Sequence, residues 1–360
     1  MTPLLLAIGL VISSPAQGTV AIAAEEVSYQ SEAYQRWWGQ ELVWRFDDLP
    51  TKGGVLQNRI PYSGHDYPDR SGGTVATMQK YDIAFHQGRS LATAFEQQDT
   101  TAITEPTMER RGLLRLRRTQ VERTPGWHGH CNGWTAAAIR HAEPQKSVRR
   151  GGVTFTPADI KALLAELYMY NAAEFLGGDE ADDAINPGTL HVSLTNWLGR
   201  NQHPLAMDSS LGREVWNYPI YAFSSTSAKR RAGKQVEVRL NIVYAGSTNR
   251  EYDKSPRVRQ GKSFHYLLDL DDEGNITGGQ YFSDSARIDM LWTPLRLAPS
   301  GQAGNERGNP HIDINEVLAV WRESVPEELR QNWVNIDDAP PLADEQQAGG
   351  SDDARSVGEE

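Results

Sequence analysis

Two stretches in the middle of the chain place apolar residues at helical spacing. Residues 132–141 are rich in Ala, Trp and Ile and stop before Pro144, which predicts a helix that opens at Cys131. Thr156 is a good N-cap, and Pro157 stands at the first helical position behind it. An amphipathic run follows at Ile160, Leu163, Leu164, Leu167 and Tyr168. A further helix is predicted over about 91–98.

The period changes to two at residue 190. Leu190 to Leu198 alternates apolar and polar positions, and the loop residues 199–202 separate it from 204–208, which predicts a β-hairpin. Further strands are predicted at 215–223, 235–245, 263–271 and 278–283, and a closing strand and helix within 310–325. A helix that carries the cysteine, followed by several antiparallel strands, is an α+β arrangement.

The two ends of the chain differ from its body. The apolar run Leu4 to Ile12, followed by the small-x-small pattern Ala21-Ile22-Ala23, predicts a signal peptide over residues 1–24 and therefore a secreted or periplasmic protein. No Lys or Arg precedes this run, so a buried N-terminal helix is the alternative reading. From Asp337 to Glu360 there are eight acidic residues and one basic residue, which predicts a disordered tail over 337–360.

Charge and hydropathy exclude two classes of partner. The formal net charge is −11, most of it in the acidic tail, so the body is only mildly acidic and shows no nucleic-acid footprint. The N-terminal apolar run is too short for a lasting anchor, and no later segment predicts a membrane span. The remaining chain is interpreted as one catalytic domain, residues 25–336, with an N-terminal extension over 25–120 ahead of its core.

Cys131 is the single cysteine, which excludes an internal disulfide and a thiolate metal site with two or more cysteine ligands. Glycines at 126, 129 and 133 and aromatic residues surround it. A thiol at a helix start meets unpaired N–H groups and the positive end of the dipole, which favour the thiolate and predict a lowered pKa. The alternative is a small buried cysteine in a helix.

A thiolate nucleophile needs a base, and the two hairpins each offer a histidine. If the first turn is centred between Gly199 and Arg200, His191 faces Asp208, which completes a Cys131–His191–Asp208 triad. In the second hairpin, His265 is the alternative base, with Phe282 opposite it and Asp284 on the diagonal. His128 and His130 rank lower, because neighbours in sequence at a helix start rarely point at one another.

Several segments together resemble the transglutaminase elicitor family, known from oomycete cell-wall proteins with bacterial relatives. The resemblance covers about residues 35 to 300. Its segments are 62–64, 67–73, 126–134, 143–144, 159–163, 186–191, 214–219, 269–280 and 292–294.

The resemblance implies acyl transfer from a glutamine side chain to a lysine or another primary amine, through a thioester on Cys131. Protein substrates carrying these groups are the implied partners. It also implies a papain-like or transglutaminase-like core, with the cysteine at a helix N-terminus packed on an antiparallel sheet. No cofactor is predicted, although calcium is associated with such enzymes. The acidic cluster Asp179, Glu180, Asp182 and Asp183 could bind this cation, but a solvated loop is the favoured interpretation.

In the expected mechanism, the backbone N–H of Cys131 and a donor near Trp127 hold the oxyanion, while Trp134 and Trp216 wall the site. The same triad with water as acceptor would make the protein a deamidase or a cysteine peptidase. A catalytically silent binding module is the third interpretation, and it predicts that His191 and Asp208 lie far from Cys131.

Overall fold

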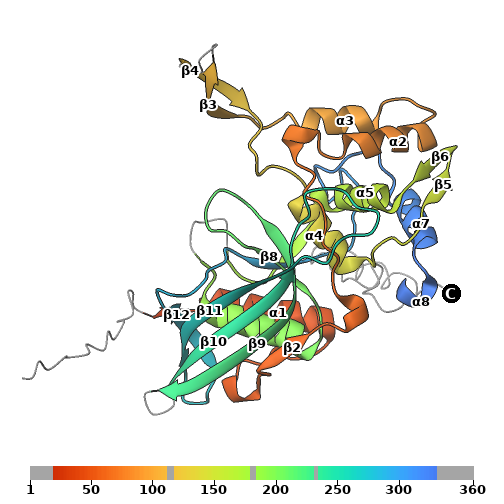
Figure 1. Cartoon of the computed structure of the whole chain (residues 1–360). Helices are drawn as coiled ribbons and strands as arrows, with labels where there is room; N and C mark the ends of the chain where they lie inside the picture. The colour runs from red at the N-terminus through yellow and green to blue at the C-terminus, as the bar shows by residue number, and fades with distance from the viewer. Residues whose placement is uncertain (1–18, 112–116, 179–183, 231–233, 331–360) are drawn as a thin grey trace, which may run out of the picture.

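The structure is a computed structural model that describes residues 19–111, 117–178, 184–230 and 234–330 (Figure 1). The predicted acidic tail over 337–360, most of the predicted signal peptide and the acidic cluster 179–183 lie outside these ranges. The division into a 25–120 extension and a core stays a prediction.

An antiparallel sheet forms the lower half of the molecule in Figure 1. Its strands follow the order β1-β12-β11-β10-β9-β8-β13-β7, and β2 pairs with β9. Their bounds are β1 Val20–Ala21, β2 Lys52–Gly54, β7 Ala173–Phe175, β8 Leu205–Asp208, β9 Asn217–Arg230, β10 Gln235–Ala245, β11 Arg259–Leu270, β12 Ile276–Tyr281 and β13 Leu291–Pro294. The α+β class is therefore confirmed.

The second predicted hairpin has the expected register. β11 pairs with β12 so that Tyr266 faces Tyr281, and the N–H of Phe282 donates to the carbonyl of His265 at 2.9 Å. The ring of His265 stacks on Phe282 at 4.1 Å, and its Nδ1 lies 2.7 Å from Asp284. A turn centred on Glu273-Gly274 predicts this register, because a hairpin's pairing follows from its turn.

The first predicted hairpin is wrong. Residues 187–193 form helix α6 (Pro187–Ser193), which continues as the π-helical segment η4 (Leu194–Arg200). Asn186 caps α6 by accepting the Gly188 N–H at 2.8 Å, and Pro187 stands at the first helical position. The buried residues Leu190, Leu194, Trp197 and Leu198 have the spacing of one helix face. Because Val192 is also apolar, part of the same segment alternates between apolar and polar positions and resembles a strand.

Helix α1 (Ala24–Trp38), α6 and η4 pack on the sheet (Figure 1). Their side chains share one hydrophobic core with those of β9 to β12, including Tyr34, Leu190, Trp197, Leu240 and Phe264. Segments α6 and η4 are buried on nearly every side. Their sequence therefore has no contrast between an apolar and a polar face from which the orientation of the helix could be predicted.

A second core holds the helical half of the molecule. Its helices are α2 (Val75–Phe85), α3 (Ala92–Asp99), α4 (Cys131–Arg140), α5 (Pro157–Met169) and α7 (Ile314–Ser324), followed by the short α8 (Glu327–Arg330). The predicted cap of α5 is confirmed, since Thr156 and Asp159 form a reciprocal capping box. Single-turn helices η1 to η3 span Phe46–Asp48, Gln57–Arg59 and Asp69–Ser71.

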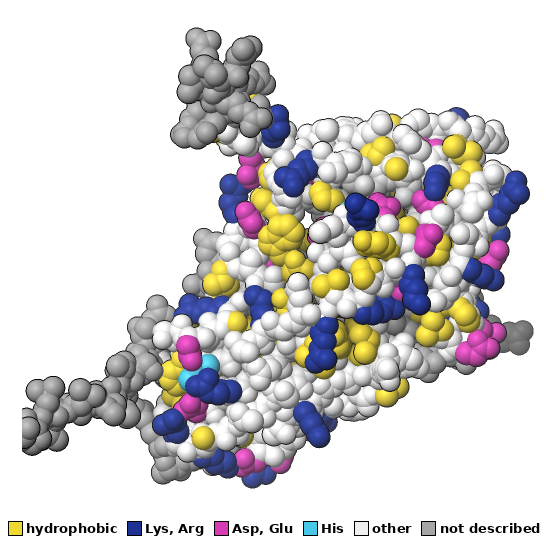
Figure 2. All heavy atoms as spheres, viewed as in Figure 1, with side chains coloured by type: hydrophobic (Ala, Val, Ile, Leu, Met, Phe, Trp, Pro, Cys, Tyr) yellow, Lys and Arg dark blue, Asp and Glu magenta, His cyan; other side chains and the backbone are white. Residues whose placement is uncertain are grey.

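Two small hairpins complete the fold. β3 (Glu105–Arg111) pairs with β4 (Arg117–Arg123) in an arm that projects from the helical half (Figure 1), and β5 (Val148–Arg150) pairs with β6 (Val153–Phe155). On the face seen in Figure 2, acidic and basic side chains are interspersed, without one large patch of either sign. Among the described residues, none of the helices combines the length and the apolar character needed to cross a bilayer.

Candidate functional site

The loop ahead of Cys131 is held by the segment 66–69. The N–H of His130 donates to the carbonyl of Asp66 at 2.7 Å, and the N–H of Asp69 donates to the carbonyl of His128 at 3.1 Å. A side chain on Gly129 would place its Cβ 2.6 Å from the Asp66 carbonyl oxygen, so only glycine allows this approach. Two of the motifs noted in the sequence thus meet here, and one positions the other.

Helix α4 begins at Cys131 and packs closely on α5. A Cβ on Gly133 would lie 2.2 Å from the carbonyl oxygen of Ala165. The nearby amide of Asn132 donates to the carbonyl of Met169 at 2.7 Å. The absent side chain at Gly133 therefore lets the two backbones touch and fixes where the thiol stands.

The thiol of Cys131 is buried and contacts strand β9 and the loop ahead of it. Its Sγ donates to the carbonyl of Val215 at 3.5 Å and accepts the Asn217 Nδ2–H at 3.6 Å. Burial raises the pKa of Cys131 to about 11, although the hydrogen bonds from Asn217 lower it. The lowered pKa predicted from the helix start is thus not found, because desolvation disfavours the thiolate in this closed arrangement.

Asn217 is the residue of the candidate site that sequence reasoning missed. Its Oδ1 accepts the indole N–H of Trp292 on β13 at 2.8 Å, and its carbonyl accepts the Thr135 hydroxyl at 3.0 Å. These contacts aim the Nδ2–H at the sulfur. The segments 214–219 and 292–294 were both noted in the sequence, but only Trp216 was selected from them.

Asp208 lies directly beside Asn217, because the two are cross-strand partners on β8 and β9. Oδ1 of Asp208 accepts the Trp216 N–H at 2.9 Å and the Ser210 hydroxyl at 3.0 Å. Its Oδ2 is buried and finds no hydrogen-bond partner among the described residues. Burial raises the pKa of Asp208, and its charge in turn helps to raise the pKa of Cys131.

His191 does not face Asp208, so the arrangement from which its base role was predicted is wrong. It lies on α6, where its Nδ1 is 2.8 Å from the Tyr266 hydroxyl and its ring stacks on Phe46 at 5.5 Å. Burial lowers the pKa of His191 to about 4. The side chain that faces Asp208 is Asn217, because β8 pairs with β9 and not with a strand at 190–198.

The other predicted histidines point to carboxylates or aromatic rings. His130 is buried and its Nε2 lies 2.9 Å from Glu166. The alternative base His265 lies on β11 between Asp284 and Glu237, with its Nε2 3.0 Å from the latter. Among the described residues, the hydrogen-bond partners of the Cys131 sulfur are Val215 and Asn217 alone.

The predicted wall residues Trp134 and Trp216, and Trp127 from the predicted oxyanion site, lie in different settings. Trp134 is buried in the same small core as Cys131 and donates to Asp66 at 2.9 Å. Trp216 is half-buried, and its indole N–H donates to Glu214 at 3.3 Å. The ring of Trp127 lies 4.0 Å from that of His128. Their roles in catalysis stay predictions.

A cavity of about 620 Å³ lies next to residues that flank or contact Cys131, although Cys131 itself does not line it. Asn132, Val215 and Asn217, which flank or contact Cys131, line it, and so do apolar groups from β7 and β13. The full lining is Asn132, Ala136, Tyr168, Asn171, Ala172, Ala173, Phe175, Gly212, Arg213, Val215, Asn217, Asp289, Met290, Trp292 and Pro294. Its size suits an extended side chain.

Comparisons with known proteins identify a family and a solved structure that the chain resembles. The family described as "Transglutaminase elicitor" matches residues 99–239, which include Cys131 and Asn217. The solved structure titled "Crystal structure of the GP42 transglutaminase from Phytophthora sojae" is 23% identical, with a TM-score of 0.66, and the match covers 85% of this chain and 99% of that one. No curated protein sequence matches the chain. The resemblance to the transglutaminase elicitor family is therefore confirmed over residues 99–239, within a fold that resembles the GP42 transglutaminase.

Proposed function

We propose that the chain is a cysteine-nucleophile acyltransferase of the transglutaminase type, acting on protein glutamine side chains and on lysine or other primary amines. The observation that carries this proposal is the position of Cys131. It heads a helix and accepts a hydrogen bond from an oriented amide, and the residues Val215 and Asn217 that contact its sulfur line a cavity large enough for a glutamine side chain. We also propose that the protein acts outside the cytoplasm after export.

The proposed reaction has two steps. The Cys131 sulfur attacks the glutamine carboxamide carbon, a C–S bond forms, and the C–N bond breaks to release ammonia. A primary amine then attacks the thioester, an amide bond forms, and the thiol is regenerated. The backbone N–H of Cys131 and a donor near Trp127 are proposed to hold the oxyanion in both steps.

The structure supports Asp208 as the proton carrier. Its unpartnered Oδ2 is buried beside Asn217, which touches the sulfur. In the first step Asp208 takes the thiol proton and passes it to the departing ammonia. In the second step it takes a proton from the incoming amine and returns it to the sulfur, so the protons balance over one cycle.

The choice between an amine and water as acceptor depends on how far water is excluded from the site. The cavity is lined by apolar groups such as Phe175, Met290 and Trp292, and also by polar side chains such as Arg213 and Asp289. Transfer is therefore proposed over hydrolysis from the resemblance to the transglutaminase elicitor family.

The test is incorporation of a labelled primary amine into a glutamine-rich protein by the full chain. We expect incorporation by the wild type and none by Cys131→Ala. We expect Asp208→Asn to lower kcat about 100-fold, as loss of a general acid–base group does. His191→Gln should retain activity; a matching loss in that variant would restore His191 as the base.

Two other outcomes separate the competing functions. Ammonia release without amine incorporation would identify a deamidase, and cleavage of the protein substrate would identify a peptidase. The one observation in favour of a catalytically silent binding module is that the thiol is buried and that burial raises its pKa. Absence of any thioester trapped on Cys131 in the presence of a glutamine substrate would support that function instead.

A further inference from the structure

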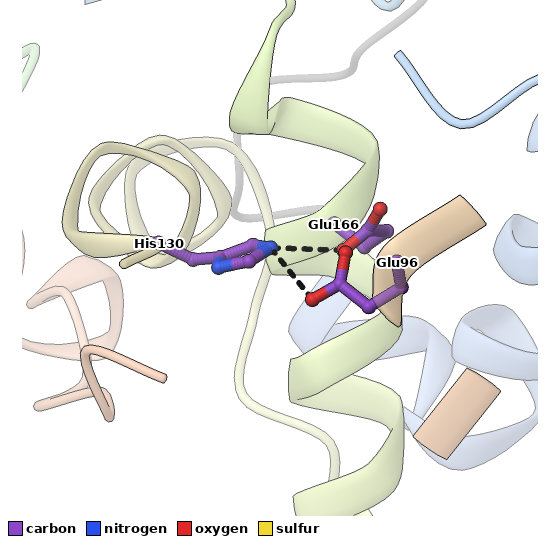
Figure 3. Close-up of side chains that lie close together, drawn as sticks. All are labelled: Glu96, His130 and Glu166. Carbon is purple, nitrogen blue, oxygen red and sulfur yellow. Dashed lines mark hydrogen bonds and ion pairs between the residues drawn. The ribbon is translucent and has the colours of Figure 1, made fainter. Parts of the chain in front are cut away.

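A second cluster of titratable side chains includes His130, the residue that precedes Cys131, and takes no part in the proposed chemistry. It consists of Glu96 on α3, His130 at the N-cap of α4 and Glu166 on α5 (Figure 3). The three side chains expose 1%, 1% and 4% of their surface. One imidazole and two carboxylates from three helices thus converge in the protein interior.

The distances within this cluster suit a bound ion. His130 Nε2 lies 2.9 Å from Glu166 Oε2 and 3.6 Å from Glu96 Oε1, and one ligand atom of each residue lies within 4.8 Å of the others. A tetrahedral ion about 2.0–2.1 Å from its ligands holds those ligands about 3.3 Å apart. The two distances from His130 Nε2, 2.9 Å and 3.6 Å, lie on either side of this ligand–ligand distance.

Glu96 also offers a fourth donor. Its Oε2 is buried and has no hydrogen-bond partner among the described residues. A cation bound between the two carboxylates would engage this oxygen if Glu96 ligates through both oxygens. An orphaned carboxylate oxygen in the interior otherwise carries a substantial desolvation cost.

Thr74 orients both carboxylates. Its N–H donates to Glu96 Oε1 at 2.8 Å, and its hydroxyl donates to Glu166 Oε2 at 2.7 Å. Hydrogen bonds of this kind to ligating oxygens are a regular feature of metal sites, where they hold the ligands in place. On the far side of the ring, Asp69 Oδ1 lies 3.9 Å from His130 Nδ1.

We propose that Glu96, His130 and Glu166 form a site for a divalent transition-metal ion of the zinc class. The imidazole ligand and the small separations favour such an ion over calcium, which prefers six to eight oxygen ligands. The ion would tie α3, α4 and α5 together next to Cys131. It would stabilise the helix that carries the thiol, without touching the reacting atoms.

The competing arrangement is a protonated His130 between the carboxylates, with no metal. Burial alone would lower the pKa of His130, but the hydrogen bond and charge of Glu166, aided by Glu96 and Asp69, raise it to about 9. Burial together with the charge of Glu166 raises the pKa of Glu96 to about 7. A metal ion must therefore displace the protons on His130 and Glu96 in order to bind.

The test uses the full chain in a Cys131→Ser background, so that the thiol cannot bind the probe. After treatment with a chelator, ZnCl₂, MnCl₂ and CaCl₂ are titrated separately, and the bound metal is counted by mass spectrometry. We expect one tightly bound Zn²⁺ per chain and a rise in Tm that grows with Zn²⁺ concentration. Failure of Zn²⁺ to bind or to raise the Tm would overturn the site, whatever the outcome of the amine-incorporation assay.

Matched variants locate the ion. Glu96→Gln should weaken Zn²⁺ binding at least about 10-fold, and Thr74→Val, which removes an orienting hydrogen bond, should weaken it about 10- to 100-fold. Glu237→Gln alters a separate histidine–carboxylate cluster, at His265, and should leave the affinity unchanged. Equal affinity in Glu96→Gln and wild type, or a loss confined to Glu237→Gln, would contradict the assignment.

A measurement on the unmutated chain covers the case in which a variant fails to fold. X-ray absorption at the zinc edge should show one nitrogen neighbour, with oxygen atoms as the remaining neighbours, at about 2.0–2.1 Å. Several nitrogen neighbours, or binding of Ca²⁺ alone, would overturn the proposal.

Discussion

At the residue scale, burial decides what each candidate can do. Cys131 was selected as a nucleophile because it is single and heads a helix, and the structure adds that its thiol is enclosed by Val215 and Asn217. His191 was selected for a facing carboxylate that it does not have. Its ring is a neutral, enclosed group that supports the core between Tyr266 and Phe46.

His191 should make the protein sensitive to acid. Burial lowers its pKa from 6.5 to about 4 in the folded chain, so the unfolded chain binds the proton first as pH falls. Stability is therefore lost between about pH 6.5 and pH 4, by about 3 kcal/mol from this residue. Urea unfolding across this range should show the slope in wild type and a reduced slope in His191→Gln. An unchanged slope would mean that other groups cause the acid sensitivity.

At the element scale, close backbone contacts and caps position the site. Helix α4 can approach α5 only because Gly133 has no side chain, and its preceding loop is held by hydrogen bonds to the segment 66–69. At the other end of the chain, strand β1 and the buried Ile22 belong to the sheet half of the molecule. Strand β1 thus adds backbone pairing to the sheet, and the adjacent Ile22 adds buried apolar surface, although the segment is short.

Gly133→Ala should separate α4 from α5. The added Cβ would fall 2.2 Å from the Ala165 carbonyl oxygen, so the helices must shift, at a cost of about 1–3 kcal/mol. Thermal unfolding should show this loss, and amine incorporation should fall with it. Gly39→Ala is the control, because its Cβ would meet nothing within 4 Å and only the left-handed backbone is strained. A Gly133→Ala chain as stable as wild type would disprove the close-contact argument.

The predicted signal-peptide boundary conflicts with strand β1. Cleavage after Ala24 would remove Val20 and Ala21, which pair with Gly279 and Gly278, and would also remove the buried Ile22. We expect a chain that begins at Glu25 to be about 2–4 kcal/mol less stable than one that begins at Gln17, mainly through loss of buried Ile22. N-terminal sequencing of the protein after the proposed export should therefore read a residue ahead of Val20. A sequence beginning at Glu25 would contradict this expectation.

At the scale of the whole molecule, the candidate site lies where the helical half meets the sheet. Cys131 comes from α4, Asn217 from β9 and Trp292 from β13. The cavity takes its lining from the same junction.

The resting thiol should react slowly with alkylating reagents. Its relative exposure is 6%, and its surroundings must open before a reagent can reach the sulfur. We expect Asn217→Ala, which removes one covering side chain, to speed alkylation by iodoacetamide about 10-fold while amine incorporation falls about 10- to 100-fold, the value of one hydrogen bond to a charged sulfur. Mass spectrometry of the labelled protein measures the first rate. Alkylation of wild type as fast as that of a free thiol would contradict the closed arrangement.

Local patterns in the sequence were enough to predict the α+β class, the cap of α5 and the pairing of β11 with β12. These patterns are the period of apolar positions, a good N-cap residue and the turn between the two strands. The role of Cys131 as nucleophile stays a prediction. The family resemblance added the expected chemistry, because several short motifs matched in the same order.

The groups that surround the sulfur were set by packing in three dimensions. Residues 190–198 satisfy both a helical and an alternating pattern, and the choice was made by the Asn186–Pro187 cap and by burial against the sheet. Asn217 faces Asp208 because β8 pairs with β9, and Glu96, His130 and Glu166 meet because three helices pack together. Contacts between residues far apart in the chain depend on packing, which a local pattern cannot specify.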